Sequence, residues 1–80
     1  MIHVYAIKSL NRNYIYVGMT DELERRLDQH QNGYEKTTRP YRPFKLIYTE
    51  LHQGRKSARA REKYLKSAAG KRFLRSLIKN

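Results

Sequence analysis

The sequence predicts an α+β domain in which a small, mainly antiparallel three-stranded sheet is flanked by helices. Two observations lead to this class. The first half of the chain alternates β-branched and aromatic segments with turn residues, and the end of the chain carries apolar residues at helical spacing. The expected order is strand, strand, helix, strand, helix, helix. Because the chain has 80 residues, we expect a single domain over residues 1–80 with a thin core.

The first two strands are expected to form a hairpin. Residues 2–8 and 14–17 are both rich in β-branched and aromatic residues, which favour strands. Between them, Asn11-Arg12-Asn13 is a turn signal. Tyr5 and Tyr16 lie on the two arms, so pairing across the hairpin would let both side chains reach a shared site.

A first helix is expected after the hairpin. Thr20 or Asp21 is a candidate cap, and the acidic residues that follow are favourable near the positive end of the helix dipole. Leu23 and Leu27 give the helix an apolar stripe, and Gly33 is expected to end it.

The remaining elements follow from the same signals. Residues 33–43 are turn-rich and basic, which predicts a surface loop, and residues 44–51 are typical of a third strand. A second helix is expected from about Arg55 to Ala68. Gly70 is expected to interrupt it before a short third helix.

The composition indicates a polyanionic partner. Eighteen Lys and Arg against seven Asp and Glu give a formal net charge of +11, which is typical of DNA or RNA binding. A membrane partner is disfavoured, because no apolar run approaches the roughly 20 residues of a spanning helix. The absence of cysteine excludes thiolate metal sites and fits a cytoplasmic, nucleoid-associated protein. Oxygen or imidazole ligands remain, and oxygen ligands favour Mg²⁺ or Mn²⁺.

Two groups of polar side chains have helical spacing. Glu22, Arg26 and His30 are four residues apart and line one face of the first helix. They form either a solvated ladder or part of a phosphate site, since the planar arginine fork binds phosphate oxygens and stays charged. Glu62 lies at the edge of an apolar stripe on the second helix. It either pairs with Lys66 or holds a cation.

Taken in order, these residues resemble the signature of the GIY-YIG nuclease superfamily, which is named for two triplets at this kind of separation. Here the triplets are His3-Val4-Tyr5 and, ten residues later, Tyr16-Val17-Gly18. The resemblance covers nearly the whole chain. It is closest to small stand-alone bacterial members, related to the N-terminal domain of the excision-repair incision subunit. The family fold, a three-stranded sheet flanked by helices, agrees with the local interpretation.

The resemblance implies roles for particular residues. Arg26 and His30 match the arginine and histidine that the family places on its first helix. Glu62, within an Arg-Glu segment, matches the single carboxylate that binds the divalent metal, so the implied cofactor is Mg²⁺ or Mn²⁺. One motif tyrosine is generally proposed as the base. We favour Tyr5, with Tyr16 orienting or sharing the proton. The ordinary phenol pKa of about 10 is too high for a base, so nearby cations, Arg26 and the metal, would have to lower it.

The implied mechanism is one-metal hydrolysis of a phosphodiester. Other basic residues are expected to contact nucleic-acid phosphates without reading sequence. These are Lys36, Arg39, Arg42, Lys45, Arg59, Lys63 and Lys66. The chain departs from the pattern in three ways: His3 replaces the first glycine, no separate targeting domain is expected, and Asn80 is a poor candidate for the late asparagine of some members.

We therefore expect a metal-dependent DNA endonuclease, structure-directed or weakly specific, that acts in DNA repair or recombination, with a protein partner supplying targeting. The alternative is a catalytically inactive nucleic-acid-binding module that acts with a partner protein. A third hypothesis is a small basic RNA-associated protein. The joint presence of Tyr5, Tyr16, Arg26 and Glu62 favours the nuclease, because a binder has no need of these residues at these spacings.

Overall fold

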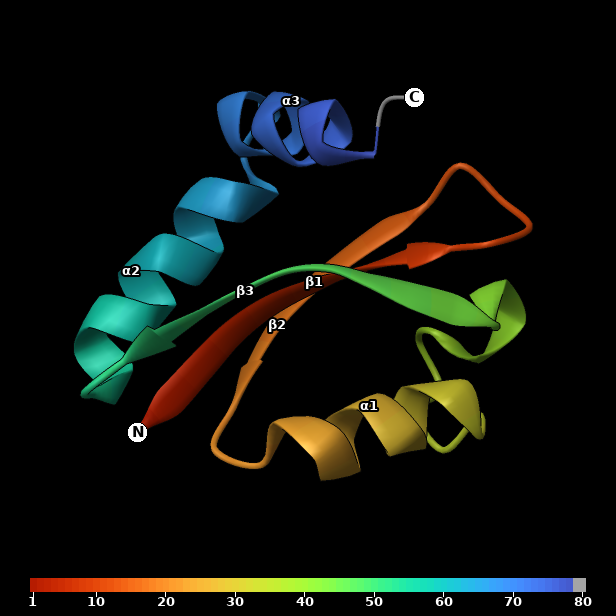
Figure 1. Ribbon diagram of the computed structural model, residues 1–80, viewed down its shortest axis with the longest axis horizontal. Helices are drawn as coiled ribbons and strands as arrows, with labels where there is room; N and C mark the ends of the chain where they lie inside the picture. Colours follow the sequence, from red (N-terminus) through yellow and green to blue (C-terminus); the bar gives the residue numbers. More distant parts are fainter. Residues whose placement is uncertain (79–80) are drawn as a thin grey trace.

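The structure, a computed structural model, describes residues 1–78 and contains a three-stranded sheet with helices on both faces (Figure 1). The strands are β1 (Ile2–Ser9), β2 (Ile15–Thr20) and β3 (Phe44–His52), and the helices are α1 (Leu23–Gln31), α2 (Arg55–Lys66) and α3 (Ala68–Leu77). A 3₁₀ turn covers Arg39–Tyr41. The predicted α+β class and element order are confirmed. Asn80 lies outside the described residues.

The strand order is β2-β1-β3, with both pairs antiparallel, so β1 lies in the centre and contributes to two cores. On one face, Val4 packs with Leu65 and Leu74 from α2 and α3. On the other face, Tyr5 packs in a cluster with Leu27 from α1. Figure 1 shows α1 on one side of the sheet and α2 with α3 on the other. Because both faces are covered, β1 is buried at consecutive positions, unlike a strand with one face in water.

The start of α1 differs from the prediction. The helix begins at Leu23, and the capping position is Glu22, which makes no side-chain cap. Thr20 instead accepts a hydrogen bond at Oγ1 from the Glu22 backbone N–H, over 3.0 Å. The expected cap at Thr20 or Asp21 is therefore wrong, because Thr20 still belongs to β2 and closes the turn before the helix. Gly33 follows the helix with φ +79°, as a helix-ending glycine requires.

The break between α2 and α3 also lies elsewhere than predicted. Ser67, with extended backbone, separates the helices, and its Oγ caps α3 by accepting a hydrogen bond from the Gly70 N–H over 3.2 Å. Gly70 lies inside α3, where a Cβ would be only 2.3 Å from the Tyr64 carbonyl oxygen. The expectation that Gly70 interrupts the helix is wrong. Its physical role is to let α3 pack closely against the end of α2.

Candidate active site

Four of the five predicted catalytic side chains meet on the α1 face of the sheet. Tyr5 comes from central strand β1, Tyr16 from edge strand β2, and Arg26 and His30 from α1. The ring centroids are 6.3 Å apart for Tyr5 and Tyr16, and the His30 ring lies 5.9 Å and 4.9 Å from these two. Tyr5 and His30 are fully buried, whereas Tyr16 and Arg26 are partly exposed. The two partly exposed groups therefore form the most accessible part of the site.

Gly18 makes room for both phenols. It pairs with Tyr5 across the β1–β2 ladder. A Cβ at position 18 would lie 2.7 Å from the Tyr5 hydroxyl oxygen and 2.9 Å from the Tyr16 ring, closer than such atoms can approach. The glycine of the second triplet is thus required by packing against the site, since its φ is not in the left-handed region.

A chain of hydrogen bonds fixes the direction of the Tyr5 proton. The Tyr5 hydroxyl lies 2.9 Å from His30 Nε2, and His30 Nδ1 lies 2.8 Å from Thr38 Oγ1. Thr38 donates its hydroxyl proton to the Glu35 backbone carbonyl, over 3.4 Å. Because a carbonyl only accepts, Thr38 accepts from His30 Nδ1–H, and a neutral His30 then accepts the Tyr5 proton at Nε2.

Burial keeps both ends of the Tyr5–His30 pair neutral. It raises the pKa of Tyr5 to about 12, although the neighbouring Arg26 acts in the opposite direction. Burial, assisted by Arg26, lowers the pKa of His30 to about 4. Arg26 alone therefore does not bring the pKa of Tyr5 below its ordinary value, because desolvation of the phenolate outweighs the guanidinium.

Arg26 is held from two sides. Its Nη1 donates to Gln29 Oε1 over 3.0 Å, and its Nη2 lies 2.9 Å from Glu35 Oε2. Burial alone would lower the pKa of Arg26, but Glu35 and the two phenols raise it above its ordinary value. The Arg26 contact and the Thr37 N–H lower the pKa of Glu35. A solvated Glu22–Arg26–His30 ladder is thus excluded, since Arg26 pairs with Glu35 and His30 is buried.

Sequence reasoning missed Glu35 and Thr38. Both lie in the loop after α1, which was interpreted only as a basic surface segment. Thr38 is fully buried, and Glu35 is partly buried against Arg26. The one signal in the sequence was an acidic residue inside an otherwise basic loop. The contact with His30 depends on how the loop folds back onto α1, which residue spacing does not encode.

Glu62 comes from α2, the helix whose buried residues pack with Val4 on the other face of the sheet. Its carboxylate pairs with Lys66 at 3.3 Å, and its side chain is 16% exposed. Within residues 1–78 no hydrogen bond or ion pair joins it to the tyrosines, Arg26 or His30. Arg61 contacts Glu50 on β3. Glu62 is rotated about 100° from Arg61 around the helix, so it lies on the other flank of the buried stripe.

The donors fit a divalent metal only if water and phosphate supply most of the ligands. No group of three or more His, Asp or Glu side chains capable of holding a metal occurs in the described part of the chain. Mg²⁺ is commonly held by one or two carboxylates together with waters and phosphate oxygens. A partly buried Glu62 carboxylate on α2 fits that requirement.

The predicted phosphate contacts are all exposed, but they do not form one cluster. One group lies on the loop after α1 and the start of β3, and the other lies on α2, which covers the opposite sheet face. Arg39 Nε also donates to the Gly33 carbonyl at 2.8 Å, and Lys66 pairs with Glu62. A nucleic acid that contacts both groups must therefore pass an edge of the sheet.

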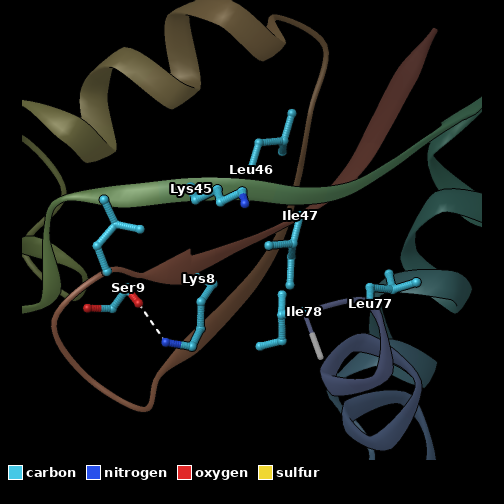
Figure 2. A pocket seen from close by; sticks show the side chains of 8 residues that line it. Lys8, Ser9, Lys45, Leu46, Ile47, Leu77 and Ile78 are labelled. Atoms are coloured by element: carbon cyan, nitrogen blue, oxygen red, sulfur yellow. Dashed lines mark hydrogen bonds between the residues drawn. The ribbon is translucent and has the colours of Figure 1, made fainter. Parts of the chain in front are cut away.

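A hollow of about 390 Å³ lies between the β1–β3 end of the sheet and the end of α3 (Figure 2). Figure 2 shows Lys8 and Lys45 on neighbouring strands, with Ile47, Leu77 and Ile78 beside them. A second hollow of about 270 Å³ lies between α1 and β3 and is lined by both apolar and polar residues, His30 among them. None of the five predicted catalytic residues lines the first hollow, so volume alone does not identify the candidate site.

Comparison with known proteins agrees with the fold and with the resemblance of the sequence motifs. The GIY-YIG catalytic domain family model matches residues 1–75. A UPF0213 protein of Clostridium perfringens is 39% identical over 67 residues, which cover 82% of this chain and 71% of the relative. A UPF0213 protein of Bacillus licheniformis is 33% identical over 70 residues, covering 86% and 72%. The solution NMR structure of a UPF0213 protein from Bacillus halodurans has a TM-score of 0.57 at 30% identity, covering 98% of this chain and 86% of that one.

Proposed function

The chain belongs to the GIY-YIG catalytic domain family, and we propose on that basis that it is a metal-dependent DNA endonuclease that hydrolyses phosphodiester bonds. The observation that carries the proposal is the convergence of Tyr5, Tyr16, Arg26 and His30 on one face of the sheet. These residues supply a guanidinium for phosphate and a hydrogen-bonded phenol–imidazole pair for proton transfer. A protein that only binds nucleic acid has no use for the buried pair.

In the proposed mechanism Arg26 binds the scissile phosphate and balances the charge that develops on it. Tyr5 is protonated at neutral pH, so it cannot act as a preformed base. Instead, its oxygen accepts a proton from the attacking water while its own proton passes to His30 Nε2, 2.9 Å away. Thr38 holds the imidazole in the tautomer that leaves Nε2 free to accept.

Tyr16 and Glu62 complete the proposed roles. Tyr16 is partly exposed beside His30 and is suited to orient the water or the phosphate. Glu62 is the residue that would hold Mg²⁺ or Mn²⁺, and the metal, when bound, would stabilise charge on the leaving 3′ oxygen. Binding a metal at Glu62 competes with its pairing to Lys66, so Lys66 must release the carboxylate, which a partly exposed pair permits at low cost.

The proposed substrate is DNA recognised by its backbone or by its structure. The exposed basic residues are suited to contact phosphates, which position a nucleic acid without reading its sequence. We assign the activity to DNA repair or recombination, with targeting by a protein partner, in the cytoplasm at the nucleoid. RNA would meet the same phosphate contacts. None of the helices within residues 1–78 is long and apolar enough to cross a membrane.

A second candidate function is nucleic-acid binding without catalysis. Two observations favour it: Glu62 pairs with Lys66, and the Arg26 fork is engaged by Glu35. If these contacts persist when nucleic acid is bound, neither the metal ligand nor the phosphate ligand is available. The protein would then act with a partner that supplies the chemistry.

A cleavage assay separates the two functions. Purified protein is incubated with supercoiled plasmid and with flapped, branched and linear duplexes in Mg²⁺ or Mn²⁺. Glu62→Gln is the test variant, and Glu24→Gln, which neutralises an exposed carboxylate on α1, is the matched control. Cleavage by the wild type and by Glu24→Gln, but not by Glu62→Gln, supports the nuclease. DNA that is bound but never cut by the wild type supports the binding module.

A further inference from the structure

Glu35 occupies the place at Arg26 where a phosphate is expected. Carboxylate and phosphate oxygens bind the planar guanidinium fork in the same way. Glu35 Oε2 lies 2.9 Å from Arg26 Nη2. A bidentate anion uses either the Nη1–Nη2 edge or the Nε–Nη2 edge of the guanidinium, so Nη2 belongs to both. A phosphate on either edge would lie beside the Glu35 carboxylate and be repelled by it.

The contact is built to open without disturbing the proton chain. The Glu35 backbone carbonyl, not its carboxylate, ends the Tyr5–His30–Thr38 chain and also accepts the Arg39 N–H over 2.9 Å. The carboxylate itself has one further contact, a 3.4 Å hydrogen bond from the Thr37 N–H. Both partners of the ion pair are about one-quarter exposed. The side chain can therefore swing into water while the backbone and His30 stay in place.

We propose that Glu35 is an internal substitute for a substrate phosphate, which holds the Arg26 fork in the free protein and is displaced by a phosphodiester of nucleic acid. The inference rests on the proposed function of Arg26. It adds a specificity: an isolated phosphate must compete with a tethered carboxylate, whereas a nucleic-acid strand has further phosphates that bind the exposed lysines and arginines and offset the cost of displacement. Glu35 thus selects polymeric nucleic acid over mononucleotides and inorganic phosphate.

The test measures inorganic phosphate binding in metal-free buffer, where cleavage plays no part. NMR follows the Arg26 side-chain signals during titration of wild type, Glu35→Gln and the matched control Glu24→Gln. We expect Glu35→Gln to bind phosphate at least about 10-fold more tightly than the wild type, since the competing charge is removed. Glu24→Gln should stay within about 2-fold, as expected for an exposed charge. Equal affinities for wild type and Glu35→Gln would overturn the proposal.

A second measurement on the wild type does not depend on the variant folding. The Glu35 side-chain carboxyl signal and the Arg26 signals are followed together as phosphate, and then a short DNA duplex, is added. Displacement predicts that both move with a common midpoint. An Arg26 signal that saturates while Glu35 does not move would refute the proposal. If the protein binds phosphate as predicted but never cleaves DNA, the nuclease function fails and the Glu35 inference stands.

Discussion

At the scale of single residues, the buried contact between Tyr5 and His30 shapes the chemistry of the site. A phenol and an imidazole 2.9 Å apart and withdrawn from water are both kept neutral. Neither group is a phenolate or another strong base before the reaction. In the proposed step, Tyr5 passes its proton to His30 as its oxygen accepts a proton from water. Thr38 and the Glu35 carbonyl favour the His30 tautomer with the proton on Nδ1, so Nε2 is the atom that accepts from Tyr5.

The depressed pKa of His30 predicts a pH dependence of stability. The folded value is about 4, and the ordinary value is about 6.5. Between them the unfolded chain binds more protons, so the free energy of unfolding falls as pH falls from 6.5 toward 4. This group contributes up to about 3 kcal/mol, fully present above pH 6.5. The NMR chemical shifts of the His30 imidazole should be those of the neutral ring down to about pH 5. A titration midpoint near 6.5 would contradict the account.

Gly18 offers a second residue-level prediction. In Gly18→Ala the new Cβ would lie 2.7 Å from the Tyr5 hydroxyl oxygen, so we expect the phenol to shift and the hydrogen bond to His30 to be disturbed. We expect single-turnover DNA cleavage to slow on the order of 100-fold, as for other small displacements of catalytic groups. Circular dichroism would check that the fold is kept. Cleavage at the wild-type rate would show that the position of Tyr5 is not critical.

Tyr5, Tyr16, Arg26 and His30 were selected because their order and spacing resemble the GIY-YIG signature. The structure brings these four side chains together, as strand pairing and helical spacing allow. Glu35 and Thr38 were missed because their contacts depend on the path of a loop. The raised pKa of Tyr5 was not foreseen, because counting nearby cations leaves out the cost of burying a phenolate.

At the scale of elements, α2 is tied to the sheet by a polar network beside its apolar stripe. Glu50 on β3 accepts hydrogen bonds from Tyr48 and from Arg61 Nε and lies 2.5 Å from His52 Nε2. The network orients α2 about its axis, with Glu62 on the other flank of the stripe from Arg61. Helical spacing does not indicate this partner of Arg61, because Glu50 lies eleven residues away on a strand.

The crossing of α2 and α3 gives a prediction about stability. In Gly70→Ala, the new Cβ would lie 2.3 Å from the Tyr64 carbonyl oxygen and 2.4 Å from the Leu65 Cα, both backbone atoms. Alanine favours an isolated helix by about 1 kcal/mol over glycine, yet we expect a net loss of about 3 kcal/mol from overpacking. Urea denaturation measures this, with Gly54→Ala, whose Cβ meets nothing within 4 Å, as the control. A stabilised Gly70→Ala would show that the helices do not cross so closely.

At the scale of the whole molecule, a charge of +11 on 80 residues dominates the approach to nucleic acid. The predicted contacts come from both sides of the sheet, so DNA must pass an edge to reach them together. The fold class and element order were predictable because apolar periodicity and turn residues are local signals. The positions of the two basic groups on opposite sides of the sheet depend on tertiary packing, which these local signals do not encode.

The salt dependence of binding tests this arrangement. If all seven predicted side chains contact phosphates, the logarithm of the binding constant should fall with the logarithm of salt concentration with a slope near −6, at about 0.9 per contact. Lys63→Gln should reduce the magnitude of that slope by about 1. Fluorescence anisotropy in metal-free buffer measures it. If Lys63→Gln leaves the slope unchanged, Lys63 does not contact a phosphate, and its helix α2 is not supported as part of the binding surface.

The most direct test of the nuclease account is single-turnover DNA cleavage by Arg26→Ala beside Arg25→Ala. The two arginines are neighbours on α1, but Arg25 is exposed and Arg26 lies between Glu35 and the phenols. We predict that Arg26→Ala lowers the cleavage rate at least about 100-fold with the fold intact, as for loss of a group that stabilises transition-state charge. Arg25→Ala should remain within a few-fold of the wild type. Equal rates for the two variants would contradict the account.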